Sequence, residues 1–324
     1  MKYRPVEVTG QVNAGGYVIP RISTRWRLRD HLGALAVRLD ISRMNYAVAP
    51  GLYAAGEPGK DSPVLACANY KLSFDVLRRQ LSGLNVWVLV IDTKGVNVWC
   101  AAGKGTFGTM EIVRKVISVD LAKIVTTRQL ILPQLGAPGV SAQLVEMFCG
   151  FSVKYGPVRA ADIKKYLDSG MNADAAMRRV TFGAGERLEV AWLEFAGAAV
   201  KGIILSLALF LIMGWPGSAL FLGVFWAAIF SGTLLTAVLL PYIPGKAFSL
   251  KGGLIGAAVA AVIVHPFQLS LVTFSSAIAA FLALNYTGCS TFTSLSGVKK
   301  EIRFALPVII GMAALSGVLF WRRI

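Results

Sequence analysis

Hydrophobic residues follow two different patterns along this chain. In the first part, short apolar runs alternate with polar turns, whereas residues 196–324 are apolar over long stretches. The run at 85–92, Asn-Val-Trp-Val-Leu-Val-Ile-Asp, predicts a strand buried on both faces, because its apolar residues are not interrupted by polar ones. Further strands are predicted at 130–132 and 150–155, and helices at 104–117 and 160–167. This alternation of strands and helices predicts a doubly wound α/β domain.

Five apolar stretches in the second part have, or approach, the length of about 17 to 25 residues that a membrane-spanning helix needs. They cover 195–213, 218–240, 252–266, 269–286 and 304–321. The third stretch is short and rich in glycine and alanine. We therefore expect a Rossmann-like α/β domain over residues 1–190, in which 1–60 shows no clear period, followed by an all-α transmembrane domain of five helices over 191–324.

The positive charges of the second part lie between particular apolar stretches. Lys246 and Lys251 separate the second stretch from the third, and Lys299, Lys300 and Arg303 separate the fourth from the fifth. Loops rich in Lys and Arg stay in the cytoplasm, so with five spans the α/β domain also faces the cytoplasm. The first residues contain no apolar signal-peptide region. The predicted location is the cytoplasmic membrane, with the soluble domain inside the cell.

The formal net charge of +16 is compatible with several acidic partners. The basic residues are dispersed, and no basic run is interleaved with aromatic residues, as nucleic-acid binding surfaces often are. No nucleic-acid partner is therefore predicted. Membrane lipids with anionic headgroups are the expected partners of these charges.

Cys100 carries the strongest chemical signal in the sequence. It follows the strand predicted at 85–92, and open α/β sheets bind ligands beyond the carboxyl ends of their strands. The small residues Ala101, Ala102 and Gly103 leave room for a large flat ligand, and a helix N-terminus together with Lys104 favours the thiolate, a soft metal ligand. Free cysteine is more often a small buried hydrophobic residue, and the sequence leaves that alternative open.

Two other motifs carry little weight. The segment 103–108 fits the letters of a dinucleotide fingerprint, but its glycines begin about ten residues after the strand instead of directly at its end. Cys67, Cys149 and Cys289 are too far apart for cluster spacing, so no iron–sulfur cluster is expected within this chain.

The segment 95–109, Gly-Val-Asn-Val-Trp-Cys-Ala-Ala-Gly-Lys-Gly-Thr-Phe-Gly-Thr, resembles the cap-helix signature of the corrinoid protein family of microbial mercury methylation. Further segments that resemble this family are 68–75, 132–137 and 155–159. A soluble domain followed by five membrane spans is also similar. A related family is the large subunit of the corrinoid iron–sulfur protein, to which 285–298 is similar, although this chain lacks the cluster cysteines and the barrel domain of that family.

The resemblance implies a cofactor, an activity and partners. The cofactor is cobalamin or a related corrinoid, whose cobalt Cys100 binds as the lower axial ligand. The implied activity is methyl transfer to Hg(II), giving methylmercury, because a thiolate opposite the methyl group stabilises the Co(III) that remains when methyl leaves as a carbanion equivalent. The implied partners are a ferredoxin-like iron–sulfur reductase protein and a methyl-donating methyltransferase or methyltetrahydrofolate system. The residues implied to contact the cofactor are Asn97, Val98, Trp99, Ala101, Ala102, Gly103, Lys104, Gln134, Gly136, Tyr155 and Gly156.

Two alternatives to this function remain. The chain could be a corrinoid methyl carrier whose acceptor is not mercury, because no cysteine-rich mercury-binding motif is present. It could also be a non-catalytic membrane sensor that binds a ligand through Cys100.

Overall fold

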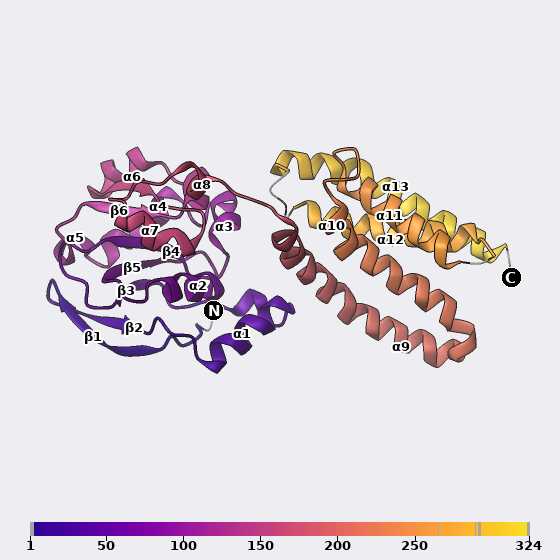
Figure 1. Ribbon diagram of the computed structural model, residues 1–324, viewed down its shortest axis with the longest axis horizontal. Coiled ribbons are helices and arrows are strands. Elements are labelled where there is room, and N and C mark those ends of the chain that lie inside the picture. The colour runs from indigo at the N-terminus through magenta and orange to yellow at the C-terminus, as the bar shows by residue number, and fades with distance from the viewer. Residues whose placement is uncertain (1–2, 265, 289, 291–292, 323–324) are drawn as a thin grey trace. The chain divides into compact units, whose positions relative to one another are not determined.

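The computed structural model describes residues 3–264, 266–288, 290 and 293–322. The chain folds into two compact units (Figure 1). The first contains residues up to Val37 and Ile41–Val180, and we call it the α/β unit. The second contains Arg38–Asp40 and the chain from Thr181 onward, and we call it the helical unit.

A seven-stranded mixed sheet forms the centre of the α/β unit, with the order β1-β2-β3-β5-β4-β6-β7. Strands β5, β4, β6 and β7 are parallel neighbours, whereas β3 is antiparallel to β5 and β1 is antiparallel to β2. The strands are β1 (Val8–Ala14), β2 (Tyr17–Ile22), β3 (Gly51–Ala55), β4 (Val64–Ala68), β5 (Val86–Ile91), β6 (Gln129–Leu132) and β7 (Ser152–Tyr155).

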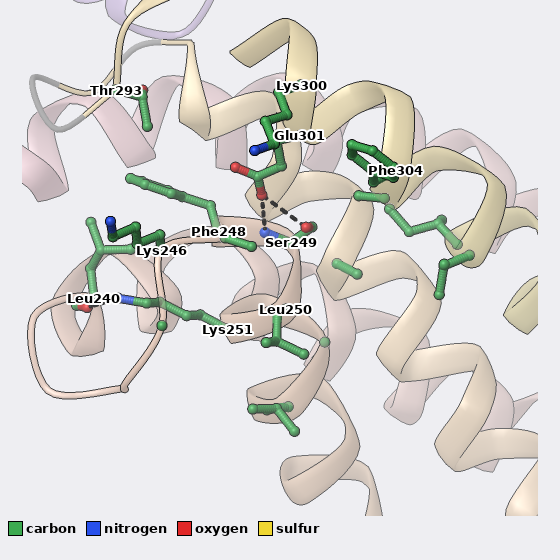
Figure 2. A pocket seen from close by; sticks show the side chains of 18 of the residues that line it. Leu240, Lys246, Phe248, Ser249, Leu250, Lys251, Thr293, Lys300, Glu301 and Phe304 are labelled. Carbon is green, nitrogen blue, oxygen red and sulfur yellow. Dashed lines mark hydrogen bonds between the residues drawn. The ribbon is translucent and has the colours of Figure 1, made fainter. Parts of the chain in front are cut away.

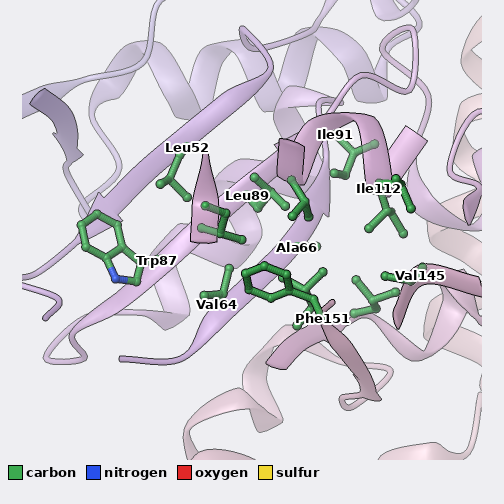
Figure 3. Close-up of a cluster of buried hydrophobic side chains, with 14 of the residues drawn as sticks. Leu52, Val64, Ala66, Trp87, Leu89, Ile91, Ile112, Val145 and Phe151 are labelled. Atoms are coloured by element: carbon green, nitrogen blue, oxygen red, sulfur yellow. The ribbon is translucent and has the colours of Figure 1, made fainter. Parts of the chain in front are cut away.

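Helices cover both faces of this sheet, which confirms the doubly wound α/β prediction. On β5, Trp87 and Leu89 belong to one core with α3, α4 and α6, while Val88 and Val90 belong to a second core with α2 and α7. Figure 3 shows the first core, where Leu89 and Ala66 of the sheet face Ile112 and Val145. The helices are α1 (Leu28–Arg38), α2 (Lys71–Gln80), α3 (Val98–Lys104), α4 (Thr109–Ser118), α5 (Leu121–Ile124), α6 (Ala142–Cys149), α7 (Ile163–Asp168) and α8 (Ala175–Arg178), with 3-10 turns η1 (Arg43–Asn45), η2 (Gln134–Gly139) and η3 (Ala160–Asp162).

The strand predicted at 85–92 is confirmed as β5, but the single helix predicted at 104–117 is wrong. Helix α3 ends where Gly105 adopts a left-handed conformation with φ of 77°. Such a backbone favours glycine and ends helices. Phe107 then enters the core with no exposed surface, and α4 begins only at Thr109.

Within the described residues, the helical unit contains four segments long and apolar enough to cross a membrane: Ala184–Ile212, Ser218–Leu239, Leu269–Thr287 and Ser296–Trp321. The third of the five predicted spans corresponds to a shorter apolar helix, α11. The first segment and most of the second lie in α9 (Ala184–Phe230), and the helix is interrupted between them at Gly214, whose φ of 68° and ψ of 173° are not helical. The elements are α9 (Ala184–Phe230), a π-helical turn η4 (Ser231–Leu235), α10 (Thr236–Leu239), α11 (Phe248–Ile263), α12 (Leu269–Thr287) and α13 (Leu295–Trp321).

Helices α11 and α12 lie side by side, and their backbones come close to each other (Figure 1). A Cβ atom at Gly252 would lie 2.4 Å from the Cβ of Ala283, and one at Gly256 would lie 2.5 Å from that of Ala279. The Ser275 hydroxyl donates a hydrogen bond across this contact to the Gly256 carbonyl at 2.8 Å. The glycine and alanine content of α11 is therefore explained by packing of small residues, which is common between membrane helices.

Candidate functional site

The site lies at the edge of the sheet where the parallel strands end. Strands β4 and β6 are neighbours, yet α2, which follows β4, packs in one core, and α6, which follows β6, packs in the other. Adjacent strands whose connections leave toward opposite faces form a switch point, where open α/β sheets bind ligands. Helix α3, which carries Cys100, follows β5 and contacts both β4 and η2. The chain therefore places Cys100 close to this switch point.

Asn69, the first residue after β4, organises the loop that leads from β5 to α3. Its side-chain oxygen accepts hydrogen bonds from the Thr93 backbone N–H at 3.1 Å and hydroxyl at 2.9 Å, and from the Gly95 N–H at 2.9 Å. Its side-chain NH₂ donates to Asp92 at 3.2 Å. Asn69 and Thr93 have no exposed surface. Because a buried amide that bonds on both sides cannot rotate freely, Asn69 fixes the loop that positions Cys100.

Residues of α3 itself hold Cys100 at the first helical turn. Asn97 is the N-cap, and its side-chain oxygen accepts a hydrogen bond from the Cys100 backbone N–H at 2.9 Å. The Cys100 side chain is exposed, as is its neighbour Trp99. A Cβ atom at Gly103 would meet no other atom within 4 Å. The open surface beside the thiol thus consists of Trp99, Gly103 and Lys104.

Ala101 and Ala102 lie on the opposite side of α3 and are buried, with 0% and 7% of their surfaces exposed. A Cβ atom at Gly139 of η2 would lie 3.0 Å from the Ala102 Cα atom. The small size of Ala102 therefore lets α3 pack closely on η2, while Ala101 belongs to the hydrophobic core. Packing within the protein already accounts for both small residues. Contact between these alanines and a cofactor ring therefore stays a prediction.

The other residues expected to contact a cofactor lie on or next to the same edge. Val98 is buried in α3, and Gly136 packs against Phe107, from which a Cβ atom would be 2.6 Å away. Gly156 follows β7, and its N–H donates to the Leu132 carbonyl at 2.8 Å.

The two polar residues of this group already have partners within the protein. The Tyr155 hydroxyl donates to the Val140 carbonyl at 2.7 Å, and Gln134 accepts a long hydrogen bond of 3.5 Å from Arg178. The structure brings these residues to one edge of the sheet, and their contact with a corrin ring stays a prediction.

The described cysteines differ sharply in their surroundings. Cys67 is buried in β4, and burial raises the pKa of its thiol to about 12. Cys149 is partly buried in α6, where burial raises the pKa of its thiol and the sulfur donates to the Val145 carbonyl at 3.1 Å. Cys289 lies outside the described residues. Among the cysteines that can be placed, only Cys100 is exposed for binding a metal.

A buried cluster of four charges lies outside the expected site. Lys71 contacts Asp30 at 2.9 Å and Asp75 at 2.5 Å, and Arg78 contacts the same two carboxylates at 2.9 and 2.8 Å. All four side chains are at most 5% exposed. The cluster connects α1 to α2 and is electrically balanced. It therefore has a structural role in the α/β unit.

Sequence reasoning did not single out the roles of Asn69 or of this cluster. A polar residue directly after the buried run Val-Leu-Ala-Cys-Ala was the available signal for Asn69, because buried amides at strand ends need hydrogen-bond partners. No comparable signal links Asp30 to Lys71, which is 41 residues away in the sequence.

The part of the chain that forms this edge of the sheet matches a known protein family. Residues 36–167 match the model of the CO dehydrogenase/acetyl-CoA synthase delta subunit family, and this range includes Cys100 and every residue expected to contact the cofactor. The comparison does not test the resemblance to the mercury-methylation family, which stays a prediction.

Curated relatives match a similar share of the chain. Acetyl-CoA decarbonylase/synthase complex subunit gamma of Archaeoglobus fulgidus is 30% identical over 123 residues, which are 37% of this chain and 26% of the relative. The subunit of the same name from Methanopyrus kandleri is 33% identical over 124 residues, again 37% of this chain and 26% of the relative. The chain thus matches about a quarter of the length of these relatives. Over residues 36–167 the α/β unit is thus similar to subunits of the CO dehydrogenase/acetyl-CoA synthase and acetyl-CoA decarbonylase/synthase complexes.

Proposed function

We propose that this chain is a membrane-anchored corrinoid methyltransferase that transfers a methyl group to Hg(II) and forms methylmercury. The observation that carries the proposal is the exposed Cys100 thiol, held at the switch point of a domain related to corrinoid proteins. The four long apolar helices support the anchoring in a membrane. The charged loops at Lys246 and Lys299 favour an orientation with the α/β unit in the cytoplasm.

The residues around Cys100 fit a corrinoid. The thiol is exposed, and the neighbouring Gly103 is open because a Cβ atom there would meet no other atom within 4 Å. Thiolate sulfur is a soft donor suited to a transition metal. In this proposal Cys100 would bind the cobalt, while Trp99, Gly103 and Lys104 would border the ring.

When bound, the corrinoid carries the methyl group and supplies it to a soft electrophile such as Hg(II). Cys100 would hold the cobalt and supply electron density to it through its thiolate sulfur. Asn97 and Asn69 hold the thiol in place through the N-cap and the loop hydrogen bonds. The reaction further requires a separate ferredoxin-like reductase and a methyl-donating methyltransferase or methyltetrahydrofolate system, with which the α/β unit would interact.

Relation to acetyl-CoA decarbonylase/synthase subunits also favours a second function, a corrinoid methyl carrier with an acceptor other than mercury. In both functions the chain binds a corrinoid through Cys100. They differ in the product formed when the methylated protein is given Hg(II).

The test uses the full chain purified anaerobically in detergent, supplied with methylcobalamin and then mixed with Hg(II) for a single turnover, so that neither the reductase nor the methyl-donating system is needed. Cys100→Ala is the variant, and Cys149→Ala is a control that removes a thiol elsewhere. We expect a corrinoid absorption spectrum and methylmercury formation from the unmodified chain and the control. Cys100→Ala should lose methylmercury formation while it melts at the same temperature, because an exposed side chain contributes little to stability, within about 0.5 kcal/mol.

Three results would contradict this proposal. Near-normal methylation by Cys100→Ala would exclude the thiolate mechanism. A corrinoid spectrum without methylmercury from the unmodified chain would favour the carrier with another acceptor. Absence of any corrinoid from protein made with an adequate corrinoid supply would favour a non-catalytic membrane sensor.

A further inference from the structure

The helical unit contains a cavity of about 1030 Å³ that the corrinoid chemistry does not use. It is open on one side and is lined by the loop after α10 and by α11, α12 and α13. Its volume is at the upper end of the range for pockets that bind drug-sized ligands, which is about 300 to 1,000 Å³.

The walls of this cavity are polar at one end and apolar at the other. Lys246, Ser249 and Lys251 line it near the start of α11, and Lys300 and Glu301 line it near the start of α13. Farther along the same helices the walls are apolar, formed by Leu254, Ala257, Val308, Ile309 and Met312. From Lys300 to Met312 the wall extends for about 18 Å along α13, since a helix rises about 1.5 Å per residue. This shape accommodates an amphiphile with one polar end.

The polar end carries an excess of positive charge. In the part of the chain that the structure describes, no carboxylate lies within ion-pair distance of the ammonium groups of Lys246, Lys251 or Lys300. Glu301 instead accepts hydrogen bonds from the Ser249 N–H at 2.7 Å and hydroxyl at 2.8 Å, as Figure 2 shows.

Lys251 is the most buried of the three lysines, with 8% of its surface exposed. Its ammonium group donates to the Leu240 carbonyl at 2.7 Å, and Figure 2 shows its side chain extending toward Leu240. A buried ammonium group that bonds only to a neutral carbonyl favours a nearby anion, because an unpaired charge is costly to bury.

We propose that this cavity binds an anionic phospholipid. The phosphate of its headgroup would lie among Lys246, Lys251 and Lys300, and an acyl chain would follow the apolar wall toward Met312. The three lysines lie near the charged loops that we place at the cytoplasmic face, so the lipid would come from the inner leaflet. This site is independent of Cys100 and of the methyl acceptor.

The experiment titrates the full chain, purified in a neutral detergent, with short-chain phosphatidylglycerol, and follows binding by native mass spectrometry and by the melting temperature. The double variant Lys246→Gln, Lys300→Gln should bind at least about tenfold more weakly, because each lysine near an anionic headgroup contributes about 1 kcal/mol. Ala257→Phe should also weaken binding without any change of charge, because it fills the apolar wall.

The matched control is the double variant Lys299→Gln, Arg303→Gln, which removes two charges from the same helix but none from the cavity lining. It should bind phosphatidylglycerol like the unmodified chain. Phosphatidylcholine with the same acyl chains should bind more weakly, and inorganic phosphate should neither raise the melting temperature nor displace the lipid. Equal binding of phosphatidylcholine, full competition by phosphate, or equal losses in both double variants would overturn the proposal, as would unchanged binding by the cavity variants.

Discussion

The core of the α/β unit and the contact between α11 and α12 of the helical unit are packed in opposite ways. The core of the α/β unit is filled by large apolar side chains such as Trp87, Leu89 and Ile91, all without exposed surface. In the helical unit, α11 instead lies against α12 through glycine and alanine. In water, large apolar side chains gain free energy by leaving the solvent. In lipid they gain little, so close approach of backbones stabilises helix pairs instead.

Helix α3 shares a feature of each unit. It belongs to the α/β unit, yet its Ala102 packs against Gly139 of η2 in the manner of α11 on α12. In both units, small residues lie where two backbones come close together. Helix α3, which carries Cys100, is at one of these positions.

The largest effect should follow from an alanine in the α/β core. Leu89→Ala replaces a fully buried isobutyl group with a methyl group and should lower the free energy of unfolding of the α/β unit by about 2 to 5 kcal/mol. Hydrogen exchange of peptides from β4 and β5 would measure this loss. Ile117→Ala is the control, since Ile117 is exposed, and it should exchange like the unmodified chain.

An alanine at the contact between α11 and α12 should also destabilise the protein, but by adding atoms to a tight contact instead of removing them from a core. Gly256→Ala adds a methyl group 2.5 Å from the Ala279 Cβ and 2.9 Å from the Ser275 carbonyl oxygen. The overlap should cost about 1 to 3 kcal/mol and lower the melting temperature of the unit in detergent. Gly311→Ala on α13 would meet no atom within 4 Å, so it should melt normally. Equal effects of the two alanines would contradict the close packing of α11 on α12.

Acid should distinguish the two units through the buried charge cluster. Burial alone would raise the pKa of Asp30, but the Arg27 N–H, Lys71 and Arg78 lower it from 3.8 to about 2. Because the folded pKa lies below the unfolded value, this stabilisation is present above pH 3.8 and is lost as the pH falls through about 2. The α/β unit should lose about 2 kcal/mol in that window.

Hydrogen exchange of α1 and α2 as a function of pH would measure this loss. In Asp30→Asn the α/β unit should be less stable at neutral pH and lose less of its stability on acidification. An unchanged pH profile in this variant would assign the acid sensitivity to other carboxylates.

The smallest effect on stability should come from the exposed side of α3. Gly103→Leu adds a side chain into open space and should change the free energy of unfolding by less than about 0.5 kcal/mol. If a corrin ring lies over this face, the variant should nevertheless purify with less corrinoid. Ala102→Leu is the contrast, since it points into the contact with η2 and should lower the melting temperature as well. Normal corrinoid content in Gly103→Leu would place the ring elsewhere.

Sequence patterns revealed those parts of the fold whose signals are local. The continuous apolar run of β5 and the long apolar segments of the helical unit were predicted because each is stabilised by its own hydrophobicity. The region 1–60 was not placed, although it holds β1, β2, α1 and β3. Strand β1 is largely exposed and contains Gly10, so its apolar residues form only a weak pattern.

The candidate site was predictable only in part. The position of Cys100 after a strand and near a helix N-terminus follows from adjacent residues, and both features are present. The orientation of Ala101 and Ala102 toward the core could not be derived, because it depends on η2, which is distant in the sequence. The role of Asn69 was missed for the same reason, since its partners begin 23 residues later.

The length of α11 has a consequence for the bilayer. Its 16 residues rise only about 24 Å, less than the roughly 30 Å of a hydrocarbon core, whereas α12 and α13 are longer. A bilayer around the helical unit would therefore have to thin by several ångströms near α11 or leave the ends of this helix beside polar headgroups. The stability of the helical unit should therefore depend on the thickness of the host membrane, which is set by the chain length of its lipids.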